Sequence, residues 1–498
     1  MSDININIIS DPALGDVYIY HLYLGPYSDT YGALGTLVTI NTHGHTTESD
    51  GSLTPTQFAA AYQGKSHGAL IMTDHDLVTA QPTGTSLVYI QANELSASTG
   101  HIVSINSDYT RGGTTDRQTQ INAVIADGGY PILAHPKWFV GYSQAVMAAL
   151  TGYLGIEIFN MFVETGAGGY NPITYPGFDI VDWDYLLTNV RLNIWGIAVD
   201  DFHSDTDWKY YDSGRLILFT NGTDLTNILD SLENGNFAAD VSNYGVTAKK
   251  PIVSNTEVSI QCDGATKIRF IGDNGVLLKE TVRDYDTYVY ADETYVRIEV
   301  VGDYTEDFAD ALDDRWNIVD GTWTVASNIL TLSATSLVRR YILRRFREGD
   351  FKAQVDVRFN DTDLDFACLM FNVLDTNRYY MMRLGTIDAS FPDWENKLAI
   401  GITATNSFVG SSPLDSYSFT PSATTWYTIK MQYTSATGRI QAKIWATGES
   451  EPGWQIDVND TTWTHGEFGF RAADGPINFD NLYIHGFKTY YQPIPIGG

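Results

Sequence analysis

The placement of histidine constrains the fold of the first half of this chain more than any other feature. Six of its ten histidines lie at or near the ends of predicted strands: His43, His45, His75, His101, His135 and His203. Residues i and i+2 of a strand point to the same side, so His43 and His45 can bind one ion together, as can Asp201 and His203. Asp50 and Glu94 follow predicted segments in the same manner. Imidazoles and carboxylates without thiolates suit Zn, Mn or Fe.

The same region alternates between strand-like and helix-like patterns. Residues 37–41 and 69–73 read as short buried strands, and Thr54-Pro55 predicts a helix start with Thr as the N-cap. A second helix is predicted over residues 115–126. More strands are predicted over residues 130–134, 155–160 and 194–199. Alternating units of this kind predict a parallel sheet, open or closed as a barrel, with its site at the carboxyl ends of the strands.

The pattern changes near residue 240. The length of 498 residues predicts two to four domains. Short alternating strands over 250–302 predict a small β-sandwich, and the Thr-, Tyr- and Trp-rich stretch over 315–488 predicts a larger one. The chain after residue 490 is rich in Pro and Gly and is expected to be extended. We therefore predict four segments: 1–245, 246–303, 304–490 and 491–498.

Charge and composition exclude several classes of protein. The chain has 60 acidic and 30 basic side chains, a formal charge of −30, which argues against binding long nucleic acid or anionic membranes. A small anionic substrate held by metal ions is still compatible. No apolar run is long enough for a membrane span, and no secretory signal is visible. Cys262 and Cys368 are expected to be buried thiols, so no disulfide framework is predicted.

Seven short motifs in order resemble the polymerase and histidinol phosphatase (PHP) superfamily over about the first 240 residues. They are His43-Gly44-His45-Thr46, Ser49-Asp50-Gly51, Met72-Thr73-Asp74-His75-Asp76, Asn93-Glu94, His101-Ile102-Val103, Ala134-His135-Pro136 and Asp201-Phe202-His203. The resemblance implies an α/β fold, a distorted (β/α)7 barrel, that binds two or three divalent metal ions. It implies nine ligands: His43, His45, Asp50, His75, Glu94, His101, His135, Asp201 and His203.

The resemblance also implies roles for particular residues. Glu94 resembles the bridging carboxylate, and Glu94 and Asp201 are expected to take part in catalysis. Glu157 is not a usual ligand of the family and is expected to support the ligands or the fold. Arg111 and Lys137 follow ligand segments and are candidates for binding phosphoryl charge, with a solvated loop cation as the favoured alternative. The other histidines are expected to be ordinary surface or core residues: His21, His67, His465 and His485.

The C-terminal half carries two further resemblances. Residues 250–302 resemble the β-domain that follows the barrel in some PHP-type enzymes, a subgroup similar to carbaryl hydrolase. Residues 306–488 resemble a concanavalin-like, laminin-G-type jelly roll on segments such as Asp314-Arg315-Trp316 and Gly321-Thr322-Trp323. The second resemblance implies carbohydrate binding. Three tryptophans are candidate sugar-stacking platforms, with core aromatics as the alternative: Trp394, Trp454 and Trp463.

Three functions follow as hypotheses. The first is a phosphoesterase acting on a phosphate mono- or diester, in a cell-surface glycan brought to it by the jelly roll. A phage tail or an extracellular location is expected for such a protein, with a trimer if it is a tail component. The second is a nuclease, a nucleotide phosphatase, or a carbamate or ester hydrolase of the PHP type. The third is a non-enzymatic adhesin, which the intact set of nine ligand positions disfavours.

Overall fold

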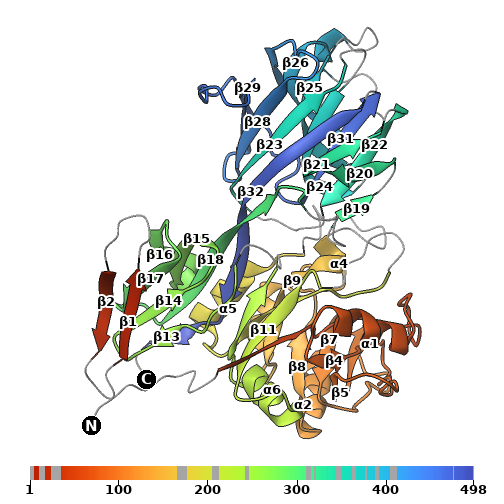
Figure 1. The fold of residues 1–498 in the computed structure, drawn as a ribbon. Coiled ribbons are helices and arrows are strands. Elements are labelled where there is room, and N and C mark those ends of the chain that lie inside the picture. The colour runs from red at the N-terminus through yellow and green to blue at the C-terminus, as the bar shows by residue number, and fades with distance from the viewer. Residues whose placement is uncertain are drawn as a thin grey trace.

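Figure 1 shows the fold of the chain in a computed structural model. The structure describes residues 5–10, 17–23, 35–164, 177–204, 212–241, 246–309, 316–318, 321–333, 335–343, 349–361, 366–375, 378–386, 392–403, 412–474 and 476–496. At the N-terminal end, β1 (Asn5–Ser10) and β2 (Val17–Tyr23) form an antiparallel pair. His21 lies in β2, but its side chain is outside the described part of the structure.

The strands of residues 35–241 belong to three sheets. β10, β9, β8, β7 and β6 form one sheet in that order, β4 pairs with β5, and β3, β11 and β12 belong to a larger sheet. Their bounds are β3 (Thr36–Ile40), β4 (Ala69–Ile71), β5 (Val88–Ile90), β6 (Ala92–Ala97), β7 (Gly100–Ile105), β8 (Tyr130–Leu133), β9 (Gly155–Asn160), β10 (Trp195–Val199), β11 (Arg215–Thr220) and β12 (Phe237–Asp240).

The predicted parallel arrangement is confirmed for only some of these strands. β9 is parallel to β8 and β10, and β4 is parallel to β5, but β7 is antiparallel to both β6 and β8. Only Ser98 and Thr99 separate β6 from β7, and a parallel crossover needs about a dozen residues or more. Single parallel bridges link the sheets at Thr39–His67, Gly44–Phe202 and His75–Glu94. Strand pairing among the described residues does not show the closed (β/α)7 barrel that we expected.

The helices between these strands begin at capping residues. Thr54 accepts a hydrogen bond from the backbone of Gln57 (3.3 Å) in a capping box, so the predicted start of α1 is confirmed. α2 starts two residues later than predicted because Asp116 is its N-cap and accepts from the backbone of Thr119 (2.8 Å). The helices are α1 (Pro55–Gly64), α2 (Arg117–Ala126), α3 (Gln144–Ala149), α4 (Met161–Glu164), α5 (Ile180–Asn189) and α6 (Leu225–Glu233).

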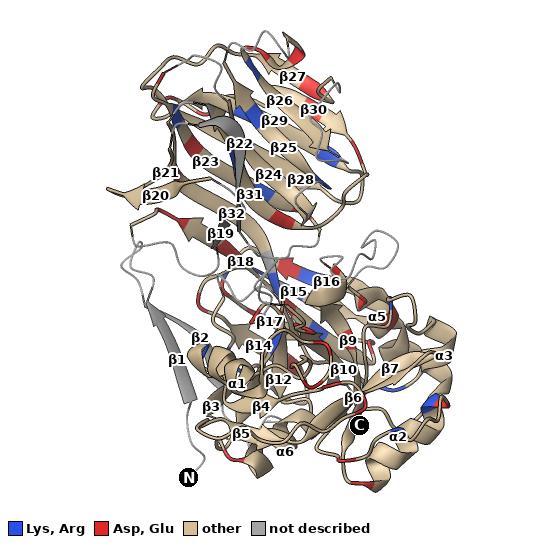
Figure 2. Ribbon diagram, turned by 90° about the vertical axis from the view of Figure 1, so that its right-hand side faces the viewer, with Lys and Arg blue, Asp and Glu red and all other residues tan. Residues whose placement is uncertain are grey.

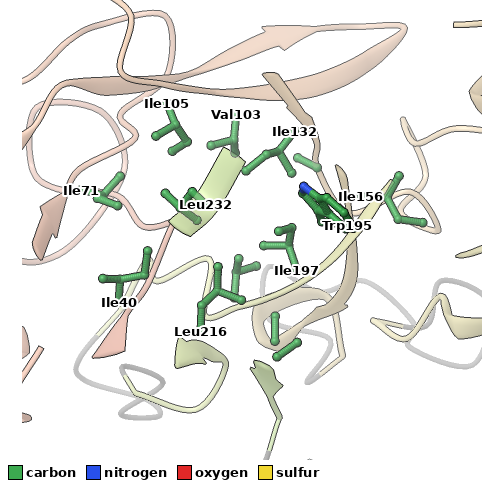
Figure 3. Close-up of a cluster of buried hydrophobic side chains, with 14 of the residues drawn as sticks. Ile40, Ile71, Val103, Ile105, Ile132, Ile156, Trp195, Ile197, Leu216 and Leu232 are labelled. Carbon is green, nitrogen blue, oxygen red and sulfur yellow. The ribbon is translucent and has the colours of Figure 1, made fainter. Parts of the chain in front are cut away.

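A core of apolar side chains holds these strands and helices together (Figure 3). Val103 of β7, Ile156 of β9 and Ile197 of β10 are each at most 1% exposed, and Leu232 of α6 joins the same cluster. Burying a side chain of this size contributes about 1.5–3 kcal/mol. The packed strands therefore provide fixed positions for the residues that follow them.

The next region is a small two-sheet unit. β13, β14 and β17 form one sheet, and β16, β15 and β18 form part of the larger sheet. Val258, Ile268 and Phe270 lie in the apolar cluster between them. The strands are β13 (Ile252–Val253), β14 (Glu257–Gln261), β15 (Ala265–Gly272), β16 (Val276–Thr281), β17 (Tyr285–Val289) and β18 (Tyr295–Glu306), with the 3-10 turn η2 (Asp273–Gly275).

A buried ion-pair cluster joins this small unit to α5. The guanidinium of Arg297 donates from Nε and Nη2 to the two carboxylate oxygens of Asp184, at 2.7 and 2.8 Å. It also donates from Nη1 to Glu299 (2.8 Å). Tyr295 donates its hydroxyl to Asp184 (3.1 Å). This cluster is called the junction cluster below.

The remaining strands form a β-sandwich, as predicted. β19, β22, β31, β24, β25, β26 and β27 form one sheet, and β20, β21, β23, β28, β29, β30 and β32 contribute to the other. Leu369, Phe470 and Ile429 lie in the core between the sheets. The elements are β19 (Trp316–Ile318), β20 (Trp323–Ala326), β21 (Ile329–Leu332), β22 (Thr335–Leu343), β23 (Phe351–Phe359), β24 (Phe366–Asp375), β25 (Arg378–Gly385), η3 (Pro392–Trp394), β26 (Lys397–Thr403), β27 (Asp415–Ser418), β28 (Trp426–Thr434), β29 (Arg439–Ala446), β30 (Ile456–Asn459), β31 (Glu467–Asp474), β32 (Ile477–Tyr491) and β33 (Ile494–Pro495).

One long strand, β32, connects all three regions (Figure 1). It pairs with β23 in the sandwich, with β18 in the small unit and with β12 in the N-terminal region. Beyond it, β33 pairs with β18, and the side chain of Gln492 hydrogen-bonds the backbone N–H (2.8 Å) and C=O (3.0 Å) of Gly196. Residues 491–496 are thus extended but packed against the other regions.

Two smaller predictions are also tested by the structure. Cys262 and Cys368 are both buried free thiols, as expected. Among the described residues, no helix has the length and apolar character that crossing a membrane requires.

Candidate metal centre

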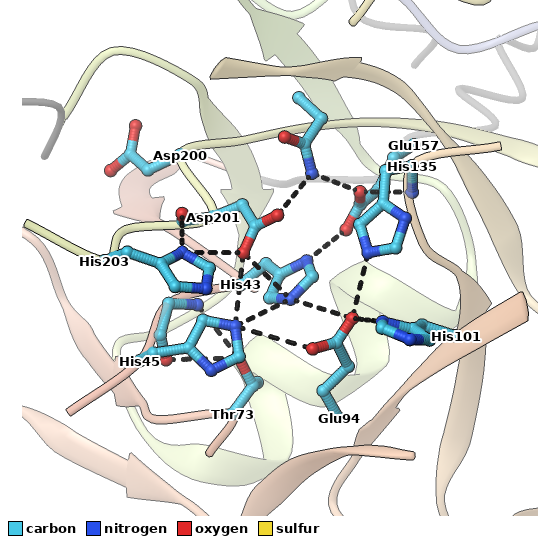
Figure 4. A network of polar contacts seen from close by, with 12 residues as sticks. His43, His45, Thr73, Glu94, His101, His135, Glu157, Asp200, Asp201 and His203 are labelled. Atoms are coloured by element: carbon cyan, nitrogen blue, oxygen red, sulfur yellow. Dashed lines mark hydrogen bonds and ion pairs between the residues drawn. The ribbon is translucent and has the colours of Figure 1, made fainter. Parts of the chain in front are cut away.

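The nine predicted ligands come together at one end of the N-terminal strands. Figure 4 labels seven of them, all but Asp50 and His75. His43 and His45 follow β3, His75 follows β4, and Glu94 and His101 lie in the hairpin of β6 and β7. His135 follows β8, and Asp201 and His203 follow β10. Their donor atoms form four overlapping groups, and within each group the atoms lie within 4.8 Å of one another.

The innermost group consists of His43, His45 and Asp201, all of them buried. Oδ1 of Asp201 lies 3.3 Å from Nε2 of His43 and 3.2 Å from Nε2 of His45. The two imidazole Nε2 atoms are 3.3 Å apart. Three atoms with lone pairs therefore point at one buried position.

Glu94 belongs to two groups and lies between the others. Its Oε1 is 2.8 Å from Nδ1 of His101, 3.0 Å from Nε2 of His135 and 3.5 Å from Nε2 of His43. Its Oε2 is 2.9 Å from Nδ1 of His75. A carboxylate with one oxygen on each side is placed as a bridging ligand would be.

The outer group is formed by Asp50, His75 and His203 together with His45. Oδ2 of Asp50 lies 3.3 Å from Nε2 of His75 and 3.5 Å from Nε2 of His203. The Asp50 side chain is 50% exposed, whereas Glu94 is 1% exposed. The centre therefore runs from a buried inner end at His43 to an open outer end at Asp50.

Glu157 and Asn160, both in β9, support the ligands from behind. Glu157 accepts from Nδ1 of His43 (2.7 Å) and from the backbone N–H of His135 (2.7 Å). Asn160 donates to Glu157 (2.8 Å) and to Oδ2 of Asp201 (3.1 Å). A carboxylate that accepts a hydrogen bond from one ring nitrogen of a histidine fixes the orientation of the ring. The other ring nitrogen is then directed toward an ion.

Two further carboxylates were not among the predicted site residues. Asp200 accepts hydrogen bonds of 2.7 Å from the backbone N–H groups of Asp212, Ser213 and Gly214, and one from the hydroxyl of Tyr62 (2.8 Å). Burial raises the pKa of Asp200 to about 7, although these hydrogen bonds oppose the rise. The second carboxylate, Asp74, accepts hydrogen bonds from the loop that follows His45.

Asp74 accepts from the backbone of Thr46 (2.8 Å) and from the hydroxyl of Ser49 (2.7 Å). It thereby anchors the loop between His45 and Asp50. The sequence signal for both carboxylates is weak, since each is only the neighbour of a predicted ligand, Asp74 of His75 and Asp200 of Asp201.

The backbone conformation at two of the predicted ligands is unusual. His135 has φ of 29° and Asp201 has φ of 51°, a region that non-glycine residues rarely adopt. Such conformations cost about 1–3 kcal/mol each and persist where the surroundings enforce them. The backbone of His135 is held by Glu157, and the N–H of Asp201 donates to the carbonyl of His43 (3.1 Å).

The charges of the centre favour a bound cation. Burial disfavours a charged His43 ring, but Asp201, Glu157 and Glu94 raise its pKa well above the usual value. Burial would raise the pKa of Glu94, but His101 and His43 hold it well below the usual value. Burial and the nearby His203 lower the pKa of His45 to about 4, so this ring is neutral at pH 7 and keeps a lone pair. Although burial opposes it, Asp50 and Glu94 raise the pKa of His75 to about 10. A divalent ion would therefore have to displace protons from His43 and His75, and imidazoles and carboxylates are donors that suit such ions.

A cavity of about 200 Å³ opens at the outer end of the centre. Two aromatic side chains that were not predicted form part of its wall. Phe162 stacks on His203 at 4.1 Å between ring centroids, and Trp138 packs edge-on against His135 at 4.8 Å. The lining residues are Asp50, His75, Glu94, His101, His135, Trp138, Phe162, Asp201 and His203.

Arg111 and Lys137, the predicted phosphoryl-binding cations, do not line this cavity. Nε of Arg111 donates to both carboxylate oxygens of Asp76, each at 2.8 Å. Lys137 donates to Asp182 and lies 3.2 Å from Asp179. Each cation is therefore engaged with acidic groups of the protein, and a role toward substrate stays a prediction for both.

The remaining predicted residues lie elsewhere. Nε2 of His67 lies 3.0 Å from Asp212, Nε2 of His465 lies 3.0 Å from Glu164, and Nδ1 of His485 lies 2.5 Å from Asp303. Trp394 and Trp463 are 2% and 6% exposed, so neither offers an open face to a sugar. Trp454 is partly exposed and lies under the ammonium group of Lys443, 4.2 Å from the ring centroid.

Comparisons with known proteins show distant likenesses. No protein-family model and no curated protein matches the chain. A two-domain protein from Bacteroides vulgatus with a predicted PHP-like metal-dependent phosphoesterase is 16% identical with a TM-score of 0.31, covering 54% of this chain and 90% of its own.

The sandwich region has distant likenesses of its own. The carbohydrate-binding module CBM66 from Bacillus subtilis is 18% identical with a TM-score of 0.28, covering 34% of this chain and 93% of its own. A basic winged bean lectin with Tn-antigen is 9% identical with a TM-score of 0.31, covering 38% of this chain and 99% of its own. TM-scores this low leave the assignment of function to the geometry of the site.

Proposed function

We propose that this protein is a metal-dependent phosphoesterase whose nine His, Asp and Glu ligands bind two or three divalent ions, Zn, Mn or Fe. The observation that supports the proposal is the convergence of these donor atoms into four overlapping groups. Glu94 takes part in two of the groups, which suits a ligand shared between ions. A set of imidazole and carboxylate donors without thiolates is typical of such centres.

Divalent ions bound here would lower the pKa of a bound water and offset the negative charge of a phosphate ester. The chain's own residues do the positioning. Glu157 fixes the ring of His43 and Asn160 fixes Asp201, so the inner ligands keep their orientation. At the outer end, Trp138 and Phe162 cover the histidines with apolar surface and exclude water from two sides of the cavity.

The size and charge of the cavity bear on the substrate. About 200 Å³ is enough for a phosphate group and its immediate substituents, while the rest of a larger substrate stays outside. No Lys or Arg is among the residues that line it. Together with the net charge of −30, this favours small or short esters over long nucleic acid.

The test uses the full chain, stripped of metal and then reloaded with Zn, Mn or Fe. Hydrolysis of p-nitrophenyl phosphate and bis-p-nitrophenyl phosphate is measured, with a p-nitrophenyl carbamate as a third substrate. We expect metal-dependent turnover of a phosphate ester, lost in His43→Ala/His45→Ala and retained in the control His485→Ala. Turnover of the carbamate alone would replace the phosphoesterase by a carbamate hydrolase, and turnover of none with any metal would contradict the proposal.

We further propose that the β-sandwich of residues 304–490 attaches the enzyme to a glycan. Its sandwich architecture supports this role, whereas the burial of Trp394 and Trp463 requires contacts other than open tryptophan faces. Binding of the full chain to a glycan array, unchanged after metal removal, is the expected result. An array on which no glycan retains the protein would contradict this attachment.

A further inference from the structure

A second cavity, of about 480 Å³, lies between the small β unit and the sandwich. It is called the junction cleft here. Its walls are residues of β15, β16 and β18 on one side and of β23, β28 and β32 on the other. Its lining residues are Lys267, Arg269, Glu280, Val301, Gly349, Asp350, Phe351, Lys352, Gln432, Tyr433, Thr434, Ser435, Ala436, His485, Gly486 and Lys488.

The junction cleft is basic in a protein that is otherwise acidic. Four of its 16 lining residues are Lys or Arg, against 30 in the whole chain of 498 residues. Only Glu280 and Asp350 contribute carboxylates to the lining. Figure 2 shows red and blue segments next to one another at β15 and β16, two of the strands whose residues line the cleft. A concave basic site on an acidic chain is a place where anions collect.

Sheet register brings the cations together. Val301 of β18 pairs with Lys267 of β15 on one side and with Lys488 of β32 on the other. The two lysines are therefore the neighbours of Val301 on either side across the sheet. Lys352 of β23 pairs with His485 of β32. Gly486, with φ of 129°, lies between these two positions of β32, and a Cβ there would be 2.9 Å from the carbonyl oxygen of Asp350. The strand therefore passes close to the start of β23, at the side of the cleft.

Two of the four cations have direct ion-pair partners, and the other two have none among the residues that the structure describes. Lys267 lies 3.2 Å from Glu280, and Arg269 lies 3.2 Å from Glu280 and 2.7 Å from Glu299. Lys352 and Lys488 form no ion pair with any residue that the structure describes. The ammonium group of Lys488 lies 6.0 Å from the centroid of the Tyr490 ring, and its charge also acts on Glu299, whose carboxylate is already paired with Arg297 and Arg269. The cleft thus keeps two positive charges that no direct ion pair neutralises.

We propose that the junction cleft binds an acidic sugar, through a phosphate or carboxylate group held by Lys352 and Lys488. The volume of the cleft suits a small saccharide. The side chains of Gln432 and Thr434 line the same cavity and provide an amide and a hydroxyl for sugar hydroxyl groups. This site does not depend on the metal centre, so the proposal stands apart from the proposed hydrolysis.

The experiment measures binding by titration calorimetry with the full chain after metal removal, which prevents phosphate from binding at the metal centre. The probes are mannose 6-phosphate, glucuronic acid, neutral mannose and inorganic phosphate, at low and high salt. We expect at least one acidic sugar to bind, more weakly as salt increases, because the attraction is between partly exposed charges. Neutral mannose is expected not to bind.

The decisive variant is Lys352→Gln/Lys488→Gln, which keeps much of each side chain and removes both charges. Its affinity for the acidic sugar should fall about tenfold, while the matched control Lys249→Gln/Lys397→Gln, with the same change of net charge outside the cleft, should bind as the wild type does. Asp350→Asn removes a repelling carboxylate, and its amide oxygen can still accept from Ser435, so the affinity should rise about threefold.

Three results would overturn the proposal. The first is that neither acidic sugar binds at low salt. The second is that the cleft variant and the charge-matched control lose affinity equally, which would mean that only net charge matters. The third is that inorganic phosphate binds as tightly as mannose 6-phosphate, which would mean that the sugar is not recognised. If the double variant unfolds, the Asp350→Asn variant still tests the proposal. An unchanged or lower affinity for the acidic sugar in that variant would contradict the assignment.

Discussion

The metal centre and the junction cluster are both buried groups of charged residues, but they are neutralised differently. At the junction, the 2%-exposed Arg297 supplies the cation between Asp184 and Glu299. At the metal centre, the carboxylates of Glu94 and Asp201 have only histidines as ion-pair partners among the described residues. In the junction cluster, an arginine of the chain itself neutralises the carboxylates. The carboxylates of the candidate metal centre have no such cation in the part of the chain that the structure describes and need a proton or an external ion, which is consistent with the proposed metal binding.

The largest expected effect comes from removing the shared carboxylate of the metal centre. Glu94→Gln keeps the size of the side chain but loses the charge that lies between the inner and outer histidines. We expect loss of at least one bound ion and a fall in phosphate-ester turnover of about a thousandfold or more. Metal analysis by mass spectrometry and steady-state kinetics test this. A variant with full metal content and full turnover would remove Glu94 from the centre.

Removing the cation of the junction cluster should lower the free energy of unfolding rather than the turnover. Arg297→Met leaves Asp184 and Glu299 buried without their cation, which costs about 3–5 kcal/mol of unfolding free energy. The matched control is Arg439→Met, at an exposed ion pair with Asp457, where the loss should be about 0–1 kcal/mol. Denaturant unfolding measures both. If both variants lost the same free energy of unfolding, the junction cluster would contribute no more to stability than an exposed ion pair does.

The junction cluster also predicts an acid limit to stability. Burial opposes ionisation of Glu299, but Arg297 and the nearby Lys488 and Arg269 lower its pKa from 4.5 to about 2. Its folded pKa is below its unfolded pKa, so its contribution, about 3 kcal/mol, is complete above pH 4.5 and is lost as the pH falls toward 2. Glu299→Gln should therefore flatten the pH dependence of unfolding in this window. The same slope in both proteins would contradict the assignment.

The smallest effect is expected from the support behind the metal ligands. Glu157→Gln removes the charge that accepts from His43, and a change at such a position typically lowers metal affinity about 10–100-fold. Competition with a chromogenic chelator measures this affinity independently of turnover. Gln118→Glu, an isosteric exchange at a partly exposed position of α2 away from the centre, is the control and should leave the affinity unchanged. Unchanged affinity in Glu157→Gln would leave Glu157 with a purely structural role.

The spacing of the residues indicated two ligand pairs, and the resemblance to the PHP superfamily implied the full set of nine, because each ligand lies in a short local motif. His43 and His45 lie two residues apart just beyond a short strand, and Asp201 and His203 repeat the spacing. The supporting carboxylates could not be found in this way. Asp200 matters because the backbone of residues 212–214 folds onto it, and this contact depends on packing rather than on local pattern.

The strand pairing was harder to predict than the strands themselves. The predicted strand over residues 155–160 is the observed β9, and the capped helix after Thr54 is α1. The antiparallel β6–β7 hairpin was missed because Ser98-Thr99 lacks the common Asn-Gly or Asp-Gly signal of a tight turn. The pairing of Ala238 with Tyr491 joins residues about half the chain apart, and no local pattern reports it.

The course of β32 has a consequence for how the chain reaches its native state. Its residues 477–491 complete one large sheet, whose other strands begin as early in the chain as Thr36 of β3. Contacts between residues so distant in sequence close large loops, and folding slows as their share of all contacts increases. During synthesis, the edges of β12, β18 and β23 stay unpaired until β32 has left the ribosome. Exposed edges of this kind invite pairing with other chains, so the interval before β32 arrives is when this protein is most exposed to aggregation.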